Sequence, residues 1–433
     1  MEQRLYTFCD VGSIDPRSFV EQEILPRVHC NHGNLSNVLA VSYTQKIYIE
    51  NALKAPRGFW FYFYIDFLPS VDTKRLAESC THLIELHDIF RTIFVSSHGQ
   101  LYQAIFESLS QPLEELPSSS SIEDQFEQVC SQYMECPVTL GSPFMQFTLL
   151  REANVRTRLV LSMSHALYDG ISLSLMMRDL GAFYRGEMLP KARNFSSYME
   201  HAVAHKTEGY DYWRGLLNGS SMTTLSPEVP ATTLNELPTI VDRDVPFPNL
   251  PPGVTAATLF TSACATMLAK LSGSSDVVFG RLMSARSNIP RALQSLVGPC
   301  INTLPVRVSF GNGATKDDVL TTIQRQYLDG LPYETTSLEN IATHCSQWPG
   351  HMLDVQCTTQ FQNIDECWLL DVPAATSRLN ARHERDMPVP AGYLHIQAAP
   401  RGEQLNVNVM AGPVYSHARV LQILDEVCKA LAG

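Results

Sequence analysis

A histidine and an aspartate stand four positions apart in residues 164–170, a short polar segment that follows an apolar run. The apolar run, residues 159–163, predicts a buried strand, and apolar residues spaced by three and four after Ile171 predict a helix. His165 and Asp169 would then lie at a helix N-terminus, where unpaired backbone N–H groups and the helix dipole stabilise negative charge. An imidazole there suits acyl transfer; the alternative is a structural histidine bonded to Asp169 or to backbone.

The composition is that of a globular protein able to bury sizeable cores. The chain has 433 residues, of which 45% are hydrophobic and 18% are charged, and this length predicts two or three domains or one two-lobed unit. The net charge of -12 argues against nucleic acid as the main partner, because phosphate binding needs a basic surface. Eleven cysteines without a CxxC pair indicate reduced core thiols, and neither a disulfide framework nor a zinc site. No uncharged apolar run reaches membrane-spanning length, so we expect a soluble, cytoplasmic protein without membrane contact.

Helix and strand patterns recur in both halves of the chain, which predicts a mixed α/β protein with two similar lobes and a cleft between them. A stretch with seven prolines between Pro227 and Pro252 separates the halves. We therefore predict an N-terminal connector, a first lobe, a Pro-rich crossover linker and a second lobe at residues 1–37, 38–218, 219–252 and 253–433.

Several motifs in a fixed order resemble the condensation domain of nonribosomal peptide synthetases. The family's central HHxxxDG motif stands here as SHALYDG at residues 164–170. Segments similar to the family's S-x-x-Q, RHExLRTxF, DVVFGxxxSGR, VGxFVNTLP, PFE and FQN elements stand at residues 42–45, 87–94, 276–286, 297–305, 332–334 and 361–363. An ordered set of motifs is far more specific than the central motif alone, and it favours an acyl-transfer role for His165.

The resemblance implies two chloramphenicol-acetyltransferase-like lobes in a V shape, with the active site in the cleft or tunnel between them. It makes His165 the catalytic residue and places an oxyanion at the backbone N–H groups of Gly170 and the helix start. Ser164, in place of the family's first histidine, either donates a hydrogen bond to substrate or fills the space of the missing ring.

The resemblance also assigns positions around the site. It makes Asp169 a structural anchor with a positive partner, for which we rank Arg281 before Arg91 and Arg286. Four further residues match family positions near the cleft, namely Ser42, Gln45, Gly298 and Asn302. Each of them can equally be a structural turn or capping residue. We expect no metal site.

The SHxxxDG form resembles the terminal, macrocyclising (CT-type) condensation-like domains of fungal synthetases of the fumiquinazoline type. This implies release of a peptidyl thioester by intramolecular cyclisation in alkaloid biosynthesis. The substrate would arrive on the phosphopantetheine arm of an upstream thiolation (carrier) domain, with no cofactor bound directly. We expect a monomer excised from a larger synthetase. The alternatives are condensation or ester formation with a free amine or alcohol, and a catalytically silent carrier-docking module.

Overall fold

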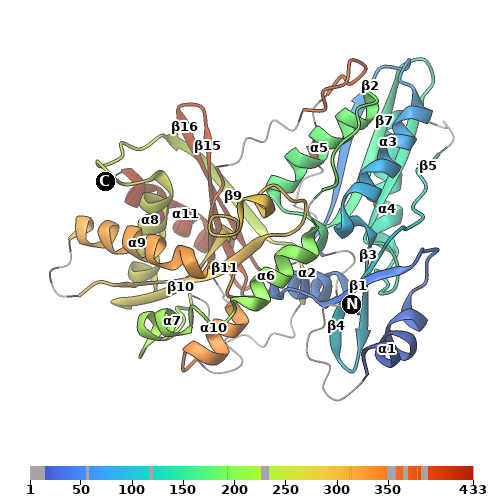
Figure 1. The fold of residues 1–433 in the computed structure, drawn as a ribbon. Helices are drawn as coiled ribbons and strands as arrows, with labels where there is room; N and C mark the ends of the chain where they lie inside the picture. Colours follow the sequence, from blue (N-terminus) through green and yellow to red (C-terminus); the bar gives the residue numbers. More distant parts are fainter. Residues whose placement is uncertain are drawn as a thin grey trace. The chain divides into compact units, whose positions relative to one another are not determined.

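The structure is a computed structural model, and it describes residues 15–54, 58–116, 120–192, 194–225, 234–311, 313, 315–348, 357–363, 369–377, 379–381 and 389–432. Helices and strands occur throughout these residues (Figure 1), as the mixed α/β prediction requires.

The chain divides into two compact units, and each is described by itself. The first unit contains residues 1–201, 289–300 and 364–384, and the second contains residues 202–288, 301–363 and 385–433. Neither unit is continuous in sequence. They therefore do not test the linear boundaries proposed at residues 37, 218 and 252, which stay predictions.

The first unit contains most of the N-terminal half of the chain. Its elements are α1 (Pro16–Phe19), η1 (Val20–Ile24), η2 (Leu25–Arg27), β1 (Leu35–Ala40), α2 (Tyr43–Lys54), β2 (Trp60–Phe67), α3 (Thr73–Leu86), η3 (Asp88–Arg91), β3 (Thr92–Ser97), β4 (Gln100–Phe106), β5 (Glu114–Glu115), α4 (Ile122–Glu135), β6 (Met145–Glu152), β7 (Arg156–Ser164), η4 (His165–Leu167), α5 (Gly170–Tyr184), most of α6 (Phe195–Ala204), η5 (Arg291–Leu293) and β13 (Asn380–Ala381).

Strand β7 occupies the centre of the first unit's larger sheet, whose order is β13-β2-β7-β6-β5. It pairs antiparallel with both neighbours, so that Leu161 lies opposite Phe63 and Phe147. Every residue of β7 after Arg156 is buried, so both faces of this strand are covered, which explains why the run before His165 is continuously apolar. Helices α3 and α5 lie side by side on this sheet (Figure 1). The strand ends at Ser164 and delivers His165 into the turn that leads to α5.

The described part of the predicted connector is packed against the first unit. Phe19, Val20 and Ile24 are buried in a hydrophobic cluster with Val38 and Tyr102. Within the connector, α1 and η1 form a short helical segment. Residues 1–14 lie outside the described residues.

The second unit contains a mixed six-stranded sheet of order β11-β10-β12-β15-β16-β9. Its elements are α7 (Tyr210–Leu217), β8 (Leu234–Glu236), β9 (Thr239–Pro246), α8 (Ala256–Ser272), β10 (Asp276–Ser284), β11 (Ile301–Ser309), α9 (Lys316–Gly330), η6 (Leu331–Tyr333), α10 (Leu338–Cys345), β12 (Cys357–Phe361), β14 (Val389–Pro390), β15 (Leu394–Arg401), β16 (Gln404–Ala411) and α11 (His417–Ala432).

Strand β9 lies inside the segment predicted to be a Pro-rich linker. It pairs with β16 along its whole length and forms the edge of the sheet. Proline lacks a backbone N–H donor and is tolerated at strand ends and at sheet edges, so the Pro-rich composition of this segment concealed a strand.

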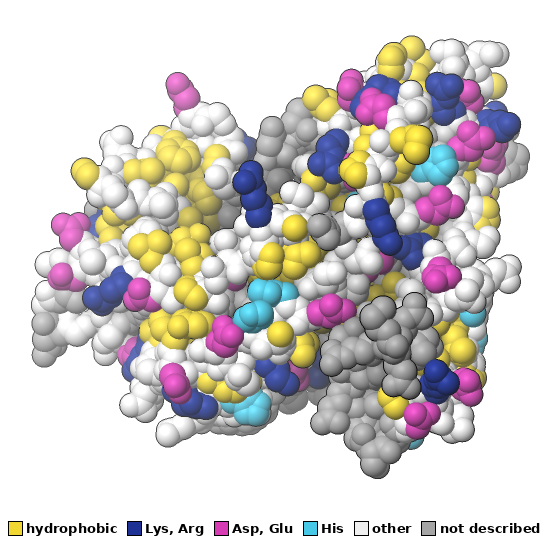
Figure 2. Space-filling model, in the orientation of Figure 1, with side chains coloured by type: hydrophobic (Ala, Val, Ile, Leu, Met, Phe, Trp, Pro, Cys, Tyr) yellow, Lys and Arg dark blue, Asp and Glu magenta, His cyan; other side chains and the backbone are white. Residues whose placement is uncertain are grey.

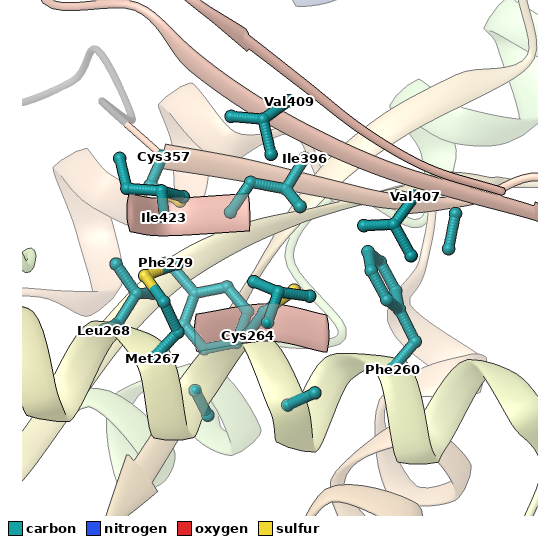
Figure 3. Packing of buried hydrophobic residues seen from close by; sticks show 14 of the residues in the cluster. Phe260, Cys264, Met267, Leu268, Phe279, Cys357, Ile396, Val407, Val409 and Ile423 are labelled. Atoms are coloured by element: carbon teal, nitrogen blue, oxygen red, sulfur yellow. The ribbon is translucent and has the colours of Figure 1, made fainter. Parts of the chain in front are cut away.

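Helix α8 packs its apolar face on this sheet (Figure 3). Phe260, Cys264 and Leu268 of α8 belong to the same buried cluster as Phe279 of β10 and Val407 of β16. Complete burial of one large apolar side chain contributes about 1.5–3 kcal/mol. The nine cysteines of the described residues are free, as the composition predicts.

Within the described residues, no helix is both long enough and apolar enough to cross a membrane. On the face shown in Figure 2, lysine and arginine side chains are scattered among acidic ones.

Candidate active site

The turn between β7 and α5 is held by caps at both of its ends. Ser164 Oγ accepts a hydrogen bond of 3.2 Å from the N–H of Ala166, and Asp169 caps the N-terminus of α5. The N–H of His165 donates to the carbonyl oxygen of Phe59 at 2.8 Å. The expected strand, turn and helix are therefore confirmed. Because Ser164 is fully buried and caps the turn, its position favours a structural role.

The imidazole of His165 has a defined tautomer. Its Nδ1 lies 2.9 Å from the carbonyl oxygen of Tyr168. A carbonyl oxygen only accepts hydrogen bonds, so Nδ1 carries the proton and Nε2 presents its lone pair. Burial lowers the pKa of His165, while the hydrogen bond to Tyr168 and the charge of Asp169 act in the opposite direction. The ring is therefore neutral at pH 7, with its basic nitrogen at Nε2.

Aromatic rings fix the plane of this imidazole. Tyr168 stacks on it with ring centroids 4.5 Å apart and planes 8° apart, and Tyr48 stacks at 4.7 Å and 18°. Phe61 approaches edge-on at 5.5 Å. Packed rings restrict ring rotation and exclude water, which favours a base held in one orientation.

Ser42 and Gln45 form a capping box before helix α2. The Gln45 N–H donates to Ser42 Oγ at 3.1 Å, and the Ser42 N–H donates to Gln45 Oε1 at 2.9 Å. Gln45 Nε2 also donates to the carbonyl oxygen of Ala166 at 3.1 Å, next to His165. Both residues are thus capping residues, and Gln45 in addition supports the turn of the site.

Asp169 is an anchor for two segments of the first unit. Its Oδ1 accepts from the N–H and the hydroxyl of Ser172 at 2.8 Å each, and its Oδ2 accepts from the N–H of Cys300 at 3.1 Å. Ser172 Oγ in turn accepts from the N–H of Gly298 at 3.0 Å. Asp169 and Arg281 belong to different units, so their pairing stays a prediction.

Gly170 begins α5 and is not among the described glycines with positive φ, so backbone shape does not require glycine there. Asp169 caps the N–H of Ser172. The N–H groups of Gly170 and Ile171 find no hydrogen-bond acceptor among the described residues of this unit. These two donors at the positive end of the helix dipole suit an oxyanion.

Gly298 does require glycine. Its φ is 152°, and a Cβ atom there would lie 2.3 Å from Cδ2 of Phe195. Its place in the site is structural, because its N–H and carbonyl group both contact Ser172 Oγ.

The other two candidates lie in the second unit. Asn302 donates through Nδ2 to the carbonyl oxygens of Glu334 and Thr336 at 2.9 and 2.7 Å, which fixes that loop. Arg281 lies over the ring of Tyr327 at 5.0 Å, and burial lowers the pKa of Arg281 to about 10. It lines a pocket with Tyr212, Trp213 and other residues, and none of the other lining residues carries a carboxylate.

Sequence reasoning missed five contributors to the first-unit site, namely Tyr48, Phe61, Tyr168, Ser172 and the N–H of Cys300. Ser172 stands three positions after Asp169, which is the spacing of a capping box and was a usable signal. Tyr48 stands three positions after Gln45 on one helix face. The Cys300 N–H carries no sequence signal.

A family model described as the condensation domain matches residues 36–433. The chain belongs to this family. PF 1022-synthetase of Rosellinia sp. is 32% identical over 446 residues, covering 96% of the chain and 14% of that relative. Beauvericin nonribosomal cyclodepsipeptide synthetase of Beauveria bassiana is 30% identical over 442 residues, covering 98% and 14%. Nonribosomal peptide synthetase ungA' of Aspergillus campestris is 32% identical over 434 residues, covering 97% and 4%. The condensation domain thus spans a small part of the length of these relatives.

Solved structures share the fold of this condensation domain. The crystal structure of CT superposes with a TM-score of 0.83 at 25% identity, covering 97% of this chain and 96% of that chain. The crystal structure of holo T3CT gives 0.81 at 24%, covering 96% and 94%. The starter condensation domain of rhizomide synthetase, as a double mutant with ligands, gives 0.71 at 17%, covering 90% and 93%. The mixed α/β condensation-domain fold expected from the motifs is therefore confirmed.

Proposed function

We propose that this condensation domain releases a carrier-bound peptidyl thioester by intramolecular cyclisation with amide formation. The observation that supports this most is the neutral imidazole of His165, which presents Nε2 as a base in the turn before α5. Ser164 in place of the first motif histidine fits a terminal domain of the fumiquinazoline type. The thioester would be presented on the phosphopantetheine arm of an upstream thiolation domain.

The chemistry follows from these groups. A nitrogen of the peptide attacks the thioester carbonyl, so that a C–N bond forms and the C–S bond breaks. Nε2 of His165 accepts the proton of that nitrogen and returns it to the leaving sulfur. The N–H groups of Gly170 and Ile171 would stabilise the tetrahedral oxyanion. Because both reacting ends belong to one molecule, an effective molarity of about 10⁵ M or more is available.

Ester formation is the second candidate. A relative named a cyclodepsipeptide synthetase is 30% identical over 98% of this chain, and the product so named contains ester bonds. The same base would then accept a hydroxyl proton, because the geometry at Nε2 does not distinguish an attacking oxygen from a nitrogen.

The test is product analysis with matched substrates. Two carrier-bound tripeptidyl thioesters are used, one with an N-terminal anthraniloyl amine and one with a hydroxyl in place of that amine. Each is incubated with the wild-type protein and with His165→Ala. The exposed His98 supplies the control variant His98→Gln. We expect a cyclic amide from the wild type and the control, and none from His165→Ala.

Other products would change the assignment. A cyclic ester alone would favour ester formation. Linear acid or no turnover in all three proteins, with carrier binding intact, would contradict the proposal and leave the docking module.

A further inference from the structure

Phe59 adopts a backbone conformation that is unusual for its side chain. Its φ is 56°, and the only other non-glycine residues of the described chain with positive φ are His98 and Asn154. His98 lies between β3 and β4 and Asn154 lies between β6 and β7, which are ordinary hairpin turns. Asparagine and histidine enter the left-handed region more readily than most residues, whereas a bulky aromatic residue there is an outlier.

The carbonyl of Phe59 contacts the backbone of the active-site histidine. Its oxygen accepts the hydrogen bond from the His165 N–H at 2.8 Å. Directly after Phe59, Trp60 lies opposite Ser164 in the pairing of β2 with β7. The contact to His165 therefore extends the β2–β7 ladder by one residue, at the point where the chain enters β2 by a turn.

The ring of Phe59 contacts the imidazole through a second residue. Its centroid lies 4.9 Å from that of Tyr48, and Tyr48 stacks on His165 at 4.7 Å. Phe59 thus reaches His165 by two routes, one through the backbone and one through Tyr48. A glycine would meet the backbone requirement without strain but would leave Tyr48 without this neighbour.

We propose that Phe59 is a positioning residue, whose strained backbone and ring together hold His165 and the Tyr48 ring in the arrangement that presents Nε2. The assignment rests on the proposed role of His165, because Phe59 acts through this residue. Strain that the surrounding structure must maintain is typical of functional sites. The strain at Phe59 would keep the carbonyl aimed at the His165 N–H while the ring supports the stack.

The test separates the two routes with three variants. Phe59→Gly removes strain and ring, Phe59→Ala removes the ring alone, and Phe59→Leu keeps an apolar side chain. A displaced base lowers the rate steeply, so we expect kcat to fall about tenfold in Phe59→Ala, which loses the ring, and up to about a hundredfold in Phe59→Gly, which loses the ring and the strain, with KM little changed in both. We expect Phe59→Leu to regain part of that loss. His98→Gly relieves positive-φ strain in the hairpin between β3 and β4, and we expect its kcat to equal that of the wild type.

A second readout does not depend on turnover. The ¹³C-labelled imidazole of His165, assigned with His165→Ala, is titrated by NMR in each variant. Removal of the Phe59 ring opens the stack to water, so the lowered pKa of His165 should move back toward about 6.5. An unchanged titration and an unchanged kcat in Phe59→Ala and Phe59→Gly would overturn the assignment. A shifted titration in a protein without cyclising activity would uphold the positioning role and contradict the proposed reaction instead. If Phe59→Gly fails to fold, Phe59→Leu and Phe59→Ala decide by the same criteria.

Discussion

Asp169 accepts a hydrogen bond of 3.1 Å from the backbone N–H of Cys300, a residue 131 positions later in the chain. The same carboxylate caps α5 through Ser172. One buried side chain therefore fixes both the start of the helix behind His165 and the loop that contains Gly298. This makes Asp169 a structural anchor, because backbone and hydroxyl donors already use both of its oxygens.

Asp169→Asn should destabilise the protein by about 2–3 kcal/mol, because the new amide NH₂ would face N–H donors in a buried site. The free energy of unfolding in urea measures the effect. Asp72→Asn is the matched control, since Asp72 is an exposed cap of α3 that accepts from the Arg75 N–H. Asn and Asp cap equally well there, so we expect a change below about 0.5 kcal/mol. Equal effects at both positions would contradict the anchor role.

The rate of cyclisation should depend on the neutral form of His165. Burial lowers the pKa of His165 below its usual 6.5, so the basic form predominates above that value. We expect kcat/KM to rise with pH through one ionisation below 6.5 and then to stay level to pH 8. Stopped assays with the carrier-bound substrate measure this profile. A rise with its midpoint above 7 would assign the ionisation to another group, and a rate that falls as the pH rises would show that the protonated ring is the active form.

Gly298→Ala should destabilise the loop at Asp169 by about 2–4 kcal/mol, through a clash added to backbone strain. The new Cβ would lie 2.3 Å from Cδ2 of Phe195. The backbone N–H of residue 298, which donates a hydrogen bond to Ser172 Oγ, would be displaced. Gly253→Ala is the control, because its φ is 78° and nothing lies within 4 Å of the new Cβ. Strain alone should cost about 1–2 kcal/mol there. Thermal unfolding compares the two variants, and equal shifts would exclude the clash.

Arg158→Met should cost about 3–5 kcal/mol, because the largely buried Asp66 would lose its two-bond partner and keep only a contact of 3.8 Å with Arg156. Arg158 donates to both oxygens of Asp66 at 2.6 and 2.9 Å and lies 4.0 Å over the ring of Tyr64. The control is Arg156→Gln, which removes ion pairs from a side chain that is 35% exposed. We expect about 0–1 kcal/mol for it. Denaturant unfolding measures both, and a small loss for Arg158→Met would show that packing alone stabilises this strand pair.

His395 should make the second unit sensitive to acid. Burial lowers the pKa of His395 to about 4, and its Nδ1 lies 2.8 Å from Thr358 Oγ1. The unfolded chain binds this proton first, so stability is complete above pH 6.5 and is lost as the pH falls toward 4. The pKa shift sets an upper limit of about 3 kcal/mol on this loss of stability. Solvent screening makes the actual loss smaller, because the ring is only half-buried. Unfolding of His395→Gln between pH 7.5 and 4.5 should show a weaker pH dependence, and a parallel curve would exclude His395.

Local elements of this protein were determined by the sequence because their signals lie within a few residues. The apolar run before Ser164, the short polar segment after it and the helical spacing after Ile171 predicted the strand, turn and helix that the structure has as β7, the turn with η4, and α5. Asp72 and Thr315 are N-caps of α3 and α9, and capping residues of this kind are signals that can be read within a few residues. The motifs also identified the family and its central histidine.

Long-range contacts were decided by the tertiary structure alone. Periodicity does not show that Gln45 donates to the carbonyl of Ala166, 121 positions later, or that Cys300 donates to Asp169. It did not reveal β9, because an edge strand tolerates prolines and needs little alternation. The left-handed backbone of Phe59 was equally invisible, since no residue type there favours it. A contact between residues far apart in the sequence depends on how whole helices and strands pack. The packing is decided by the total free energy of the fold, so no local sequence pattern reveals the contact.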